Sequence, residues 1–233
     1  MKQHYLLWQT ARLSARLSVH LGLVLIVSCT LVSGRLGALA QNQLGSWQFW
    51  SGLFDSDPPV PPTEGGRRGD VCLIAPMTSP GHMAQVWDSQ PTVVWQGAVG
   101  RLELQQDDQD AVILEQERGT ANFATYEGEP LAPNTIYRWR IYLPYTEQPA
   151  FEVPLTVLPT EEKESIAQDL QQLDAELTAA MASAEEKALR RADYFAARGL
   201  WSDFWGEVLS VESPSTELED TIEEALMQLC KTE

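Results

Sequence analysis

Residues 131–143 read Leu-Ala-Pro-Asn-Thr-Ile-Tyr-Arg-Trp-Arg-Ile-Tyr-Leu. From Thr135 onward, every second side chain is large and apolar, and two of the side chains between them are arginines. The apolar set is Tyr137, Trp139, Ile141 and Leu143, and the arginines are Arg138 and Arg140. Residues two apart in a strand lie on the same face of a sheet. The stretch therefore predicts a β-strand from Thr135 to Leu143 with one buried face and one face toward water.

The same pattern continues on both sides of this strand. Residues 151–157 alternate in the same way, and Pro154 within them cannot donate a ladder hydrogen bond, which predicts an edge strand. Shorter strands are predicted at 92–95, 101–105, 111–114 and 122–126, with turn-forming residues between them. About seven short strands at this spacing predict a β-sandwich over residues 71–158.

Part of this region resembles a known family of sandwich domains. Six residues match the L-x-P-x-T-x-Y-x-[VFW]-x-[VI] run of fibronectin type III domains: Leu131, Pro133, Thr135, Tyr137, Trp139 and Ile141. The resemblance implies an Ig-like or fibronectin-III-like antiparallel sandwich. It also implies that Tyr137 forms a tyrosine corner, with its hydroxyl bonded to upstream backbone, and that Trp95 and Trp139 lie in the core.

From Thr160 the apolar spacing becomes helical. Leucines and other apolar residues recur every three or four positions, at Ile166, Leu170, Leu173, Leu177 and Met181. Thr160 is a candidate N-cap, and Ser183 with Glu186 could open a second helix or lie within one continuous helix. The sequence thus predicts an α+β fold in which a helical subdomain at 159–233 follows the sandwich.

Two more helices are predicted near the C-terminus. Residues 200–209 form a short aromatic helix in which Trp201 and Trp205 occupy a wide apolar stripe, so both are assigned to the core. Thr216 with Glu219 is a candidate capping box for the last helix. Residues 192–205 resemble the helix–turn–helix of a tetratricopeptide repeat, although one such unit alone does not make a repeat array.

The N-terminus has the parts of a secretory signal peptide. Residues 1–40 contain no Asp or Glu, an apolar run follows a basic start, and Ala38-Leu39-Ala40 is a small-x-small cleavage site. We predict a signal peptide at 1–40 and an exported protein in the periplasm or outside the cell. The alternatives are lipidation at Cys29, which ends a lipobox-like Ile-Val-Ser-Cys, and an uncleaved membrane anchor.

The segment at 41–70 separates the signal peptide from the sandwich. It contains four prolines and a Gly-Gly pair without hydrophobic periodicity, so we predict a disordered Pro/Gly-rich linker. Cleavage after Ala40 leaves two cysteines, Cys72 and Cys230. Because disulfides form in exported proteins, these two are predicted to be bridged, with two free buried thiols as the alternative.

A longer resemblance covers residues 66–230. Its marks are the Arg-Arg-Gly-Asp-x-Cys start, Pro-Thr-Val-Val-Trp, Tyr-Arg-Trp, and Ala-x-Tyr-Phe-Ala-x-x-Gly-Leu-Trp near the C-terminus. Together with the signal peptide, they are similar to a family of cyanobacterial exported proteins known as a domain of unknown function. Residues 141–144 lack the Cys-Asp of that family. The resemblance implies export and a sandwich with helices, and it brings no activity.

No catalytic, metal or cofactor motif stands out. The mature chain would contain one histidine, His82, in a Pro-Gly loop and without an identifiable partner for catalysis. Asp107, Asp108 and Asp110 lack the Gly and distal Glu of a calcium loop and predict a solvated hairpin tip. We therefore expect no catalytic residues, no metal ligands and no cofactor.

The net charge of the chain argues against some classes of binding partner. The full chain carries a net charge of −17, and removal of residues 1–40 leaves 12 Lys and Arg against 33 Asp and Glu, or −21. Such a charge disfavours nucleic acid, and membrane contact is expected only through a lipidated Cys29 or an uncleaved N-terminus.

The sequence predicts a non-catalytic interaction module with an envelope protein as partner. The alternatives are a carbohydrate-binding module, which would need exposed tryptophans in a groove, and less favoured a hydrolase. A hydrolase would need a cleft that joins His82 or two acids to a buried group with a shifted pKa.

Overall fold

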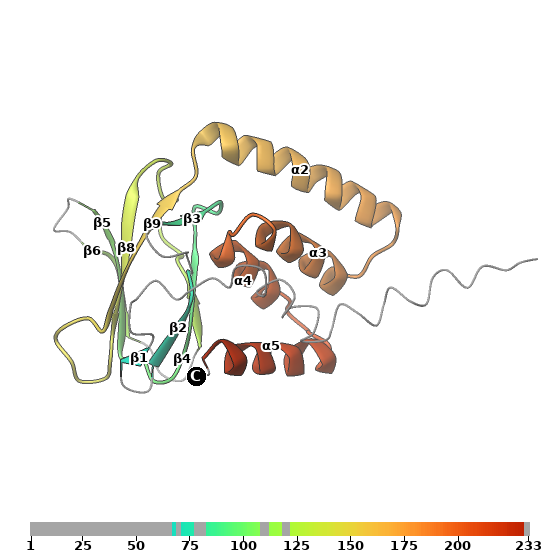
Figure 1. Ribbon diagram of the computed structural model, residues 1–233. Helices are drawn as coiled ribbons and strands as arrows, with labels where there is room; N and C mark the ends of the chain where they lie inside the picture. The colour runs from blue at the N-terminus through green and yellow to red at the C-terminus, as the bar shows by residue number, and fades with distance from the viewer. Residues whose placement is uncertain (1–66, 69–70, 77–82, 108–111, 118–121, 231–233) are drawn as a thin grey trace, which may run out of the picture. The chain divides into compact units, whose positions relative to one another are not determined.

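The computed structural model describes residues 67–68, 71–76, 83–107, 112–117 and 122–230. Within these ranges the chain is α+β, with two β-sheets and four helices (Figure 1). The predicted signal peptide, Cys29 and the linker up to residue 66 lie outside the described residues. No helix in the described ranges is long and apolar enough to span a membrane.

The first sheet has four antiparallel strands in the order β1-β2-β4-β7. They are β1 (Arg67–Arg68), β2 (Val71–Ala75), β4 (Thr92–Gln96) and β7 (Phe123–Thr125). The strand β1 lies within the segment 41–70 that was predicted as a linker. Backbone pairing of Arg67 with Cys72 and Arg68 with Val71 forms β1, and such pairing leaves no hydrophobic pattern in the sequence.

The second sheet has five strands in the order β3-β9-β8-β5-β6. They are β3 (Ala84–Val86), β5 (Arg101–Gln106), β6 (Val112–Glu117), β8 (Ile136–Tyr142) and β9 (Phe151–Val157). The pair β3–β9 is parallel and the other pairs are antiparallel. The sequence analysis missed β3, whose three residues are too short for a period to show.

The strand β9 is not at the edge of its sheet, contrary to the prediction from Pro154. It pairs with β8 on one side and with β3 on the other. The ladder with β3 starts at Leu155, opposite Ala84, so Pro154 lies one residue before it. The missing N–H of proline therefore leaves no gap in the β3–β9 ladder.

A hydrophobic core lies between the two sheets and contains the residues predicted for it. Trp95 and Trp139 are completely buried, and Tyr137 is nearly so. The hydroxyl of Tyr137 accepts a hydrogen bond of 2.9 Å from the backbone N–H of Ala132, five residues upstream. Both sheets contribute inward side chains, and the polar alternate positions of β8 and β9 face away.

A second core lies between the outer face of the first sheet and the helices. Cys72, Ile74 and Val94 belong to it, together with Trp201 and Trp205. All five residues of β2 are buried because its two faces contact different cores. This explains the continuous Val-Cys-Leu-Ile-Ala run, which is typical of strands covered on both faces.

The helices are α2 (Thr160–Ala179), α3 (Ala184–Ala196), α4 (Trp201–Leu209) and α5 (Thr216–Leu229). Ser183 caps α3 by accepting from the N–H of Glu186 at 3.1 Å, so the second-helix alternative is the one observed. The predicted caps at Thr160 and Thr216 are wrong by one residue. Pro159 precedes α2, and Ser215 caps α5 by accepting from the N–H of Leu218.

Cys72 and Cys230 form a disulfide with an S–S distance of 2.01 Å. It joins the strand β2 to the end of the helix α5, and both cysteines are buried in the core beneath the helices. The bridge closes a loop across a sequence separation of 158. The helical part is thus tied covalently to the first sheet.

Candidate functional site

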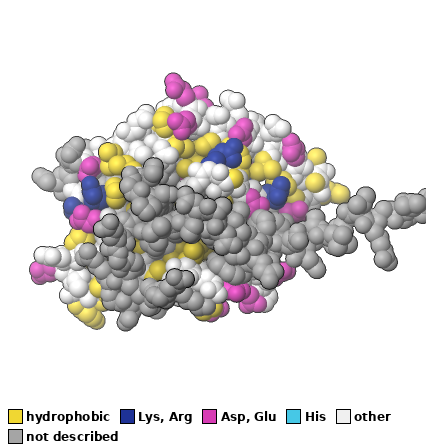
Figure 2. All heavy atoms as spheres, in the orientation of Figure 1, with side chains coloured by type: hydrophobic (Ala, Val, Ile, Leu, Met, Phe, Trp, Pro, Cys, Tyr) yellow, Lys and Arg dark blue, Asp and Glu magenta, His cyan; other side chains and the backbone are white. Residues whose placement is uncertain are grey.

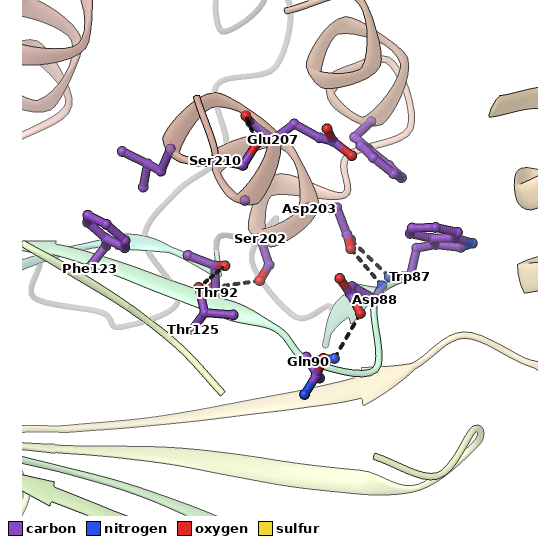
Figure 3. A pocket seen from close by; sticks show the side chains of 13 residues that line it. Trp87, Asp88, Gln90, Thr92, Phe123, Thr125, Ser202, Asp203, Glu207 and Ser210 are labelled. Atoms are coloured by element: carbon purple, nitrogen blue, oxygen red, sulfur yellow. Dashed lines mark hydrogen bonds between the residues drawn. The ribbon is translucent and has the colours of Figure 1, made fainter. Parts of the chain in front are cut away.

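A cavity of about 280 Å³ lies where α4 crosses the end of the first sheet (Figure 3). It is lined by the segment 87–90 before β4, by the strands β4 and β7, by Phe195 of α3, and by α4 with its C-cap residue Ser210. The strands contribute Thr92, Phe123 and Thr125, and α4 contributes Ser202, Asp203, Gly206, Glu207 and Ser210 among others.

Gly206 leaves space between α4 and β4. It lies in the interior of α4, where glycine destabilises a helix by about 1 kcal/mol relative to alanine. A Cβ at this position would have Thr92 Oγ1 at 3.4 Å as its nearest neighbour, an ordinary contact distance. Alanine would therefore fit, whereas a longer side chain would extend toward the strand and the cavity. A glycine in the middle of the predicted aromatic helix was a signal for this site that the sequence analysis did not use.

Hydrogen bonds from buried polar groups hold α4 on the sheet. The hydroxyl of Ser202 donates to the carbonyl of Thr92. The carboxylate of Asp203 accepts from the backbone N–H groups of Trp87 at 2.9 Å and Asp88 at 2.7 Å (Figure 3). Because both oxygens of Asp203 are used in this way, the side chain fixes the segment 87–90 against α4.

Trp87 connects the same segment to the other helices. Its ring packs against Phe195 of α3 with the centroids 5.5 Å apart. Its indole Nε1 donates to the carbonyl of Lys163 in α2 at 3.1 Å, and Lys163 Nζ donates to Ser89 Oγ. The wall of the cavity at 87–90 is thus fixed by three helices.

Asp203 has an unusual protonation equilibrium for an aspartate. Burial raises its pKa from 3.8 to about 7, although the hydrogen bonds from the N–H groups of Trp87 and Asp88 act in the opposite direction. The nearby carboxylate of Asp88 raises the pKa further. Desolvation disfavours the charged form of a buried carboxyl group, and here this effect exceeds that of the two hydrogen bonds.

We predict that the protein is more stable at pH 5 than at pH 7.5. A raised pKa means that the folded state retains a proton that the unfolded chain has lost. The contribution of Asp203 to stability is therefore complete below pH 4 and decreases as pH rises toward 7. Asp193, whose pKa burial raises to about 6, acts in the same direction. The shift at Asp203 corresponds to a few kcal/mol, on the order of 4.

Thermal melting at constant ionic strength across this range tests the prediction. Asp203→Asn removes the titrating group, and its amide cannot accept both backbone N–H groups. This variant should therefore melt lower at pH 5 and should lose most of the pH dependence. A melting temperature of the wild type that is constant or rises between pH 5 and 7.5 would contradict the prediction.

The charged groups that line the cavity are acidic. Asp88 is exposed, Asp203 is buried, and Glu207 is bound to Arg191 at 2.7 Å. None of the lining residues is Lys or Arg. On the face of the molecule shown in Figure 2, acidic side chains are scattered, with Lys and Arg between them. The cavity therefore differs from that surface in having acids without cations at its lining.

The strand β7 borders the cavity and is the last strand of its sheet among the described residues. The carbonyl of Asn122 and the amide of Tyr126 both bond toward the β4 side. Bonded residues alternate along an antiparallel strand, so the N–H and C=O groups of Phe123 and Thr125 point away from β4. The side chain of Phe123 is 40% exposed. The edge thus offers backbone donors and acceptors directly beside the cavity.

The residues singled out in the sequence are only partly brought together here. Trp95, Trp139, Trp201 and Trp205 are buried, so they form no sugar platform, and only Trp87 of the described tryptophans lines the cavity. Asp107 accepts from Arg138 at 3.0 Å, whereas His82, Asp108 and Asp110 lie outside the described residues. In the described ranges, no group of three or more His, Cys, Asp and Glu is placed to hold a metal ion.

The sequence analysis did not identify Asp203, Gly206 or the edge at Phe123 as functional residues. Searches with family models, curated proteins and solved structures find no match to this chain.

Proposed function

We propose that this protein is an exported, non-catalytic interaction module of the cell envelope. Its partner is an extended segment of another envelope protein, which pairs with β7 as an additional strand. Strand addition to an exposed sheet edge is a general mode of peptide recognition, in which the backbone supplies affinity and neighbouring pockets supply specificity.

One arrangement supports this proposal above all: the edge of β7 and the cavity lie side by side. Among the described strands, none pairs with the outward N–H and C=O groups of Phe123 and Thr125, and both side chains line the cavity beside α4. Side chains of an added strand would alternate between the cavity and the opposite face. The net negative charge of the chain disfavours a nucleic acid in this position.

We also propose that the two sheets form an Ig-like or fibronectin-III-like sandwich. The order β2-β4-β7 in one sheet and β9-β8-β5 in the other corresponds to the A-B-E and G-F-C strands of that fold. The hydrogen bond between Tyr137 and Ala132 near the start of β8 supports a tyrosine corner. Membership in the cyanobacterial exported family rests on the sequence marks at 66–230.

A photo-crosslinker at residue 123 tests the proposed site. Benzoylphenylalanine in place of Phe123, in the full exported chain, should capture one contiguous segment of an envelope protein. The same group at Tyr145, which is fully exposed in the β8–β9 connection, is the matched control and should not capture that segment. Equal capture at both positions, or none at residue 123, would overturn the proposal.

Phe123→Pro should reduce capture of the partner at least tenfold, because proline removes one outward N–H from the edge. Phe123→Thr keeps the N–H and the preference for strand, so it separates the backbone contribution from that of the ring. Pull-down with the purified variants, after melting curves have established that both fold, measures the difference. Equal capture by the proline variant would argue against strand addition.

A hydrolase is the second candidate, and one observation favours it. Asp203, with a pKa of about 7, lines a cavity with two other acids, and such a carboxyl group can act as a general acid. Against it, both oxygens of Asp203 already accept backbone hydrogen bonds. Hydrolysis of ester or glycoside substrates by the wild type, with loss in Asp88→Asn, would favour this candidate.

Export is tested by the mass of the secreted protein. Cleavage after Ala40 should give a chain that begins at Gln41, because Ala38-Leu39-Ala40 matches a signal-peptidase site. Intact mass spectrometry of the protein from the periplasm or medium measures this. A retained N-terminus, or a diacylglyceryl group on Cys29, would contradict the prediction and would place the protein on a membrane.

A further inference from the structure

We infer that the added strand carries a lysine or arginine whose charged end lies in the cavity beside Asp88 and Glu207. This inference rests on the proposed function and specifies the chemistry of the partner segment: extended and basic.

The direction of the side chain follows from the geometry of β7. Residues directly opposite each other in paired strands have their side chains on the same face. Phe123 and Thr125 face the cavity, whereas Ala124 between them is buried in the core between the sheets. A partner residue opposite Phe123 or Thr125 would therefore point its side chain toward the cavity.

The lining favours a cation in that position. Asp88 is exposed, and its carboxylate accepts a hydrogen bond from the N–H of Gln90. Two cations lie behind this lining: the ammonium of Lys163 donates to Ser89 and attracts the carboxylates of Asp88 and Asp203, and Arg191 bonds to Glu207 and Asp174. Neither cation is itself a lining residue of the cavity. A partner carboxylate would meet two like charges, whereas an ammonium or guanidinium group would bring the first cation into the lining.

The size of the cavity agrees with one long side chain. A volume of about 280 Å³ lies just below the range of about 300–1,000 Å³ that is typical of small-molecule pockets. The apolar stem of lysine or arginine can pack on the ring of Phe123 while its charged end remains with the acids and hydroxyl groups. The net charge of the chain would also attract a basic segment over longer distances.

Fluorescence polarisation with three labelled peptides tests this inference. The probes are Gly-Thr-Val-Lys-Val-Thr-Gly and its counterparts with norleucine or glutamate in place of lysine, added to the full disulfide-bonded chain. We expect the lysine peptide to bind at least tenfold more tightly than either counterpart. We also expect its affinity to fall as salt rises, because screening weakens exposed charge pairs.

Variants of the protein locate the effect. Asp88→Asn should remove most of the preference for lysine, whereas Glu147→Gln, an equal change of charge in the exposed β8–β9 connection, should not. Gly206→Leu should fill the cavity and weaken the lysine peptide, and Gly206→Ala, whose Cβ fits at 3.4 Å from Thr92, is its control.

The outcomes separate the two proposals. If the norleucine or glutamate peptide binds as tightly as the lysine peptide, the inference of a basic partner is wrong and strand addition stands. If none of the three peptides binds and the crosslinker at residue 123 captures nothing, both proposals are wrong.

Discussion

Trp205→Ala is expected to lower the free energy of unfolding by about 3–5 kcal/mol, the usual cost of truncating a large buried aromatic side chain. Trp205 is completely buried in the core between the first sheet and the helices. Its ring packs edge-on against Phe204 with centroids 5.3 Å apart, and Phe204 packs in the same way on Trp201. Removal of the Trp205 ring would leave a cavity beneath α4, the helix that forms one wall of the candidate site.

The loss is large relative to the total stability of a domain, which is about 5–15 kcal/mol. Chemical denaturation and thermal melting measure it, and Trp205→Phe, which retains most of the apolar volume, should lose much less. The hydrogen bonds of Ser202 and Asp203 depend on the position of α4, so capture of the partner should fall in parallel with stability. Unchanged stability with abolished capture would show that Trp205 is a recognition residue.

The α+β organisation could be predicted from period alone. Alternation at 135–143 predicts β8 within one residue at each end, and the stripe from Ile166 onward predicts α2. In these segments, burial of one face fixes both the pattern in the sequence and the element in the structure. The two wrong caps differ from the observed ones by one residue, because the path of the chain into each helix places Pro159 and Ser215 at the N-cap positions.

The site could not be predicted in the same way. Asp203 is a polar residue within an apolar helix, and its partners are the backbone N–H groups of Trp87 and Asp88, more than 100 residues away in sequence. Almost every residue has a backbone N–H group, so the identities of residues 87 and 88 do not reveal that they bind Asp203. The edge of β7 depends on the order of strands in its sheet, which a single sequence does not specify. Gly206 can be recognised in the sequence as a glycine within a helix. Its role in leaving space beside the sheet depends on the position of Thr92 in β4, which the sequence does not give.

The buried acid and the aromatic core also explain why α4 is the central helix of the site. Trp201, Phe204 and Trp205 fix it to the core, and Ser202 and Asp203 fix its other face to β4 and to the segment 87–90. A helix held on both faces has little freedom to move, so the cavity beside Gly206 has fixed walls. A partner side chain would therefore bind to a preformed space, which reduces the entropic cost of association.

Loss of the Cys72–Cys230 bridge is the second change expected to have a large effect. In the chain-entropy model, a loop that spans 158 positions contributes about 4–5 kcal/mol by restricting the unfolded chain. Cys72→Ala with Cys230→Ala should therefore lower the melting temperature of the protein by many degrees. The double variant avoids a free thiol, and peptide mapping of the wild type under non-reducing conditions should recover the linked pair.

The bridge also determines which part of the chain should open first when it is absent. The helix α5 contributes only three buried residues of its own, Leu218, Thr221 and Ala225, whereas Trp201, Phe204 and Trp205 of α4 all lie in the core. Ile222, Leu226 and Leu229 of α5 pack against the same core but are only partly buried. Without the covalent link to β2, α5 should therefore exchange its backbone amides faster than β4 or α4. Hydrogen exchange of the double variant measures this order. Two freely alkylated thiols in the native protein, or equal protection of α5 and α4 in the variant, would show that packing alone holds the last helix on the sheet.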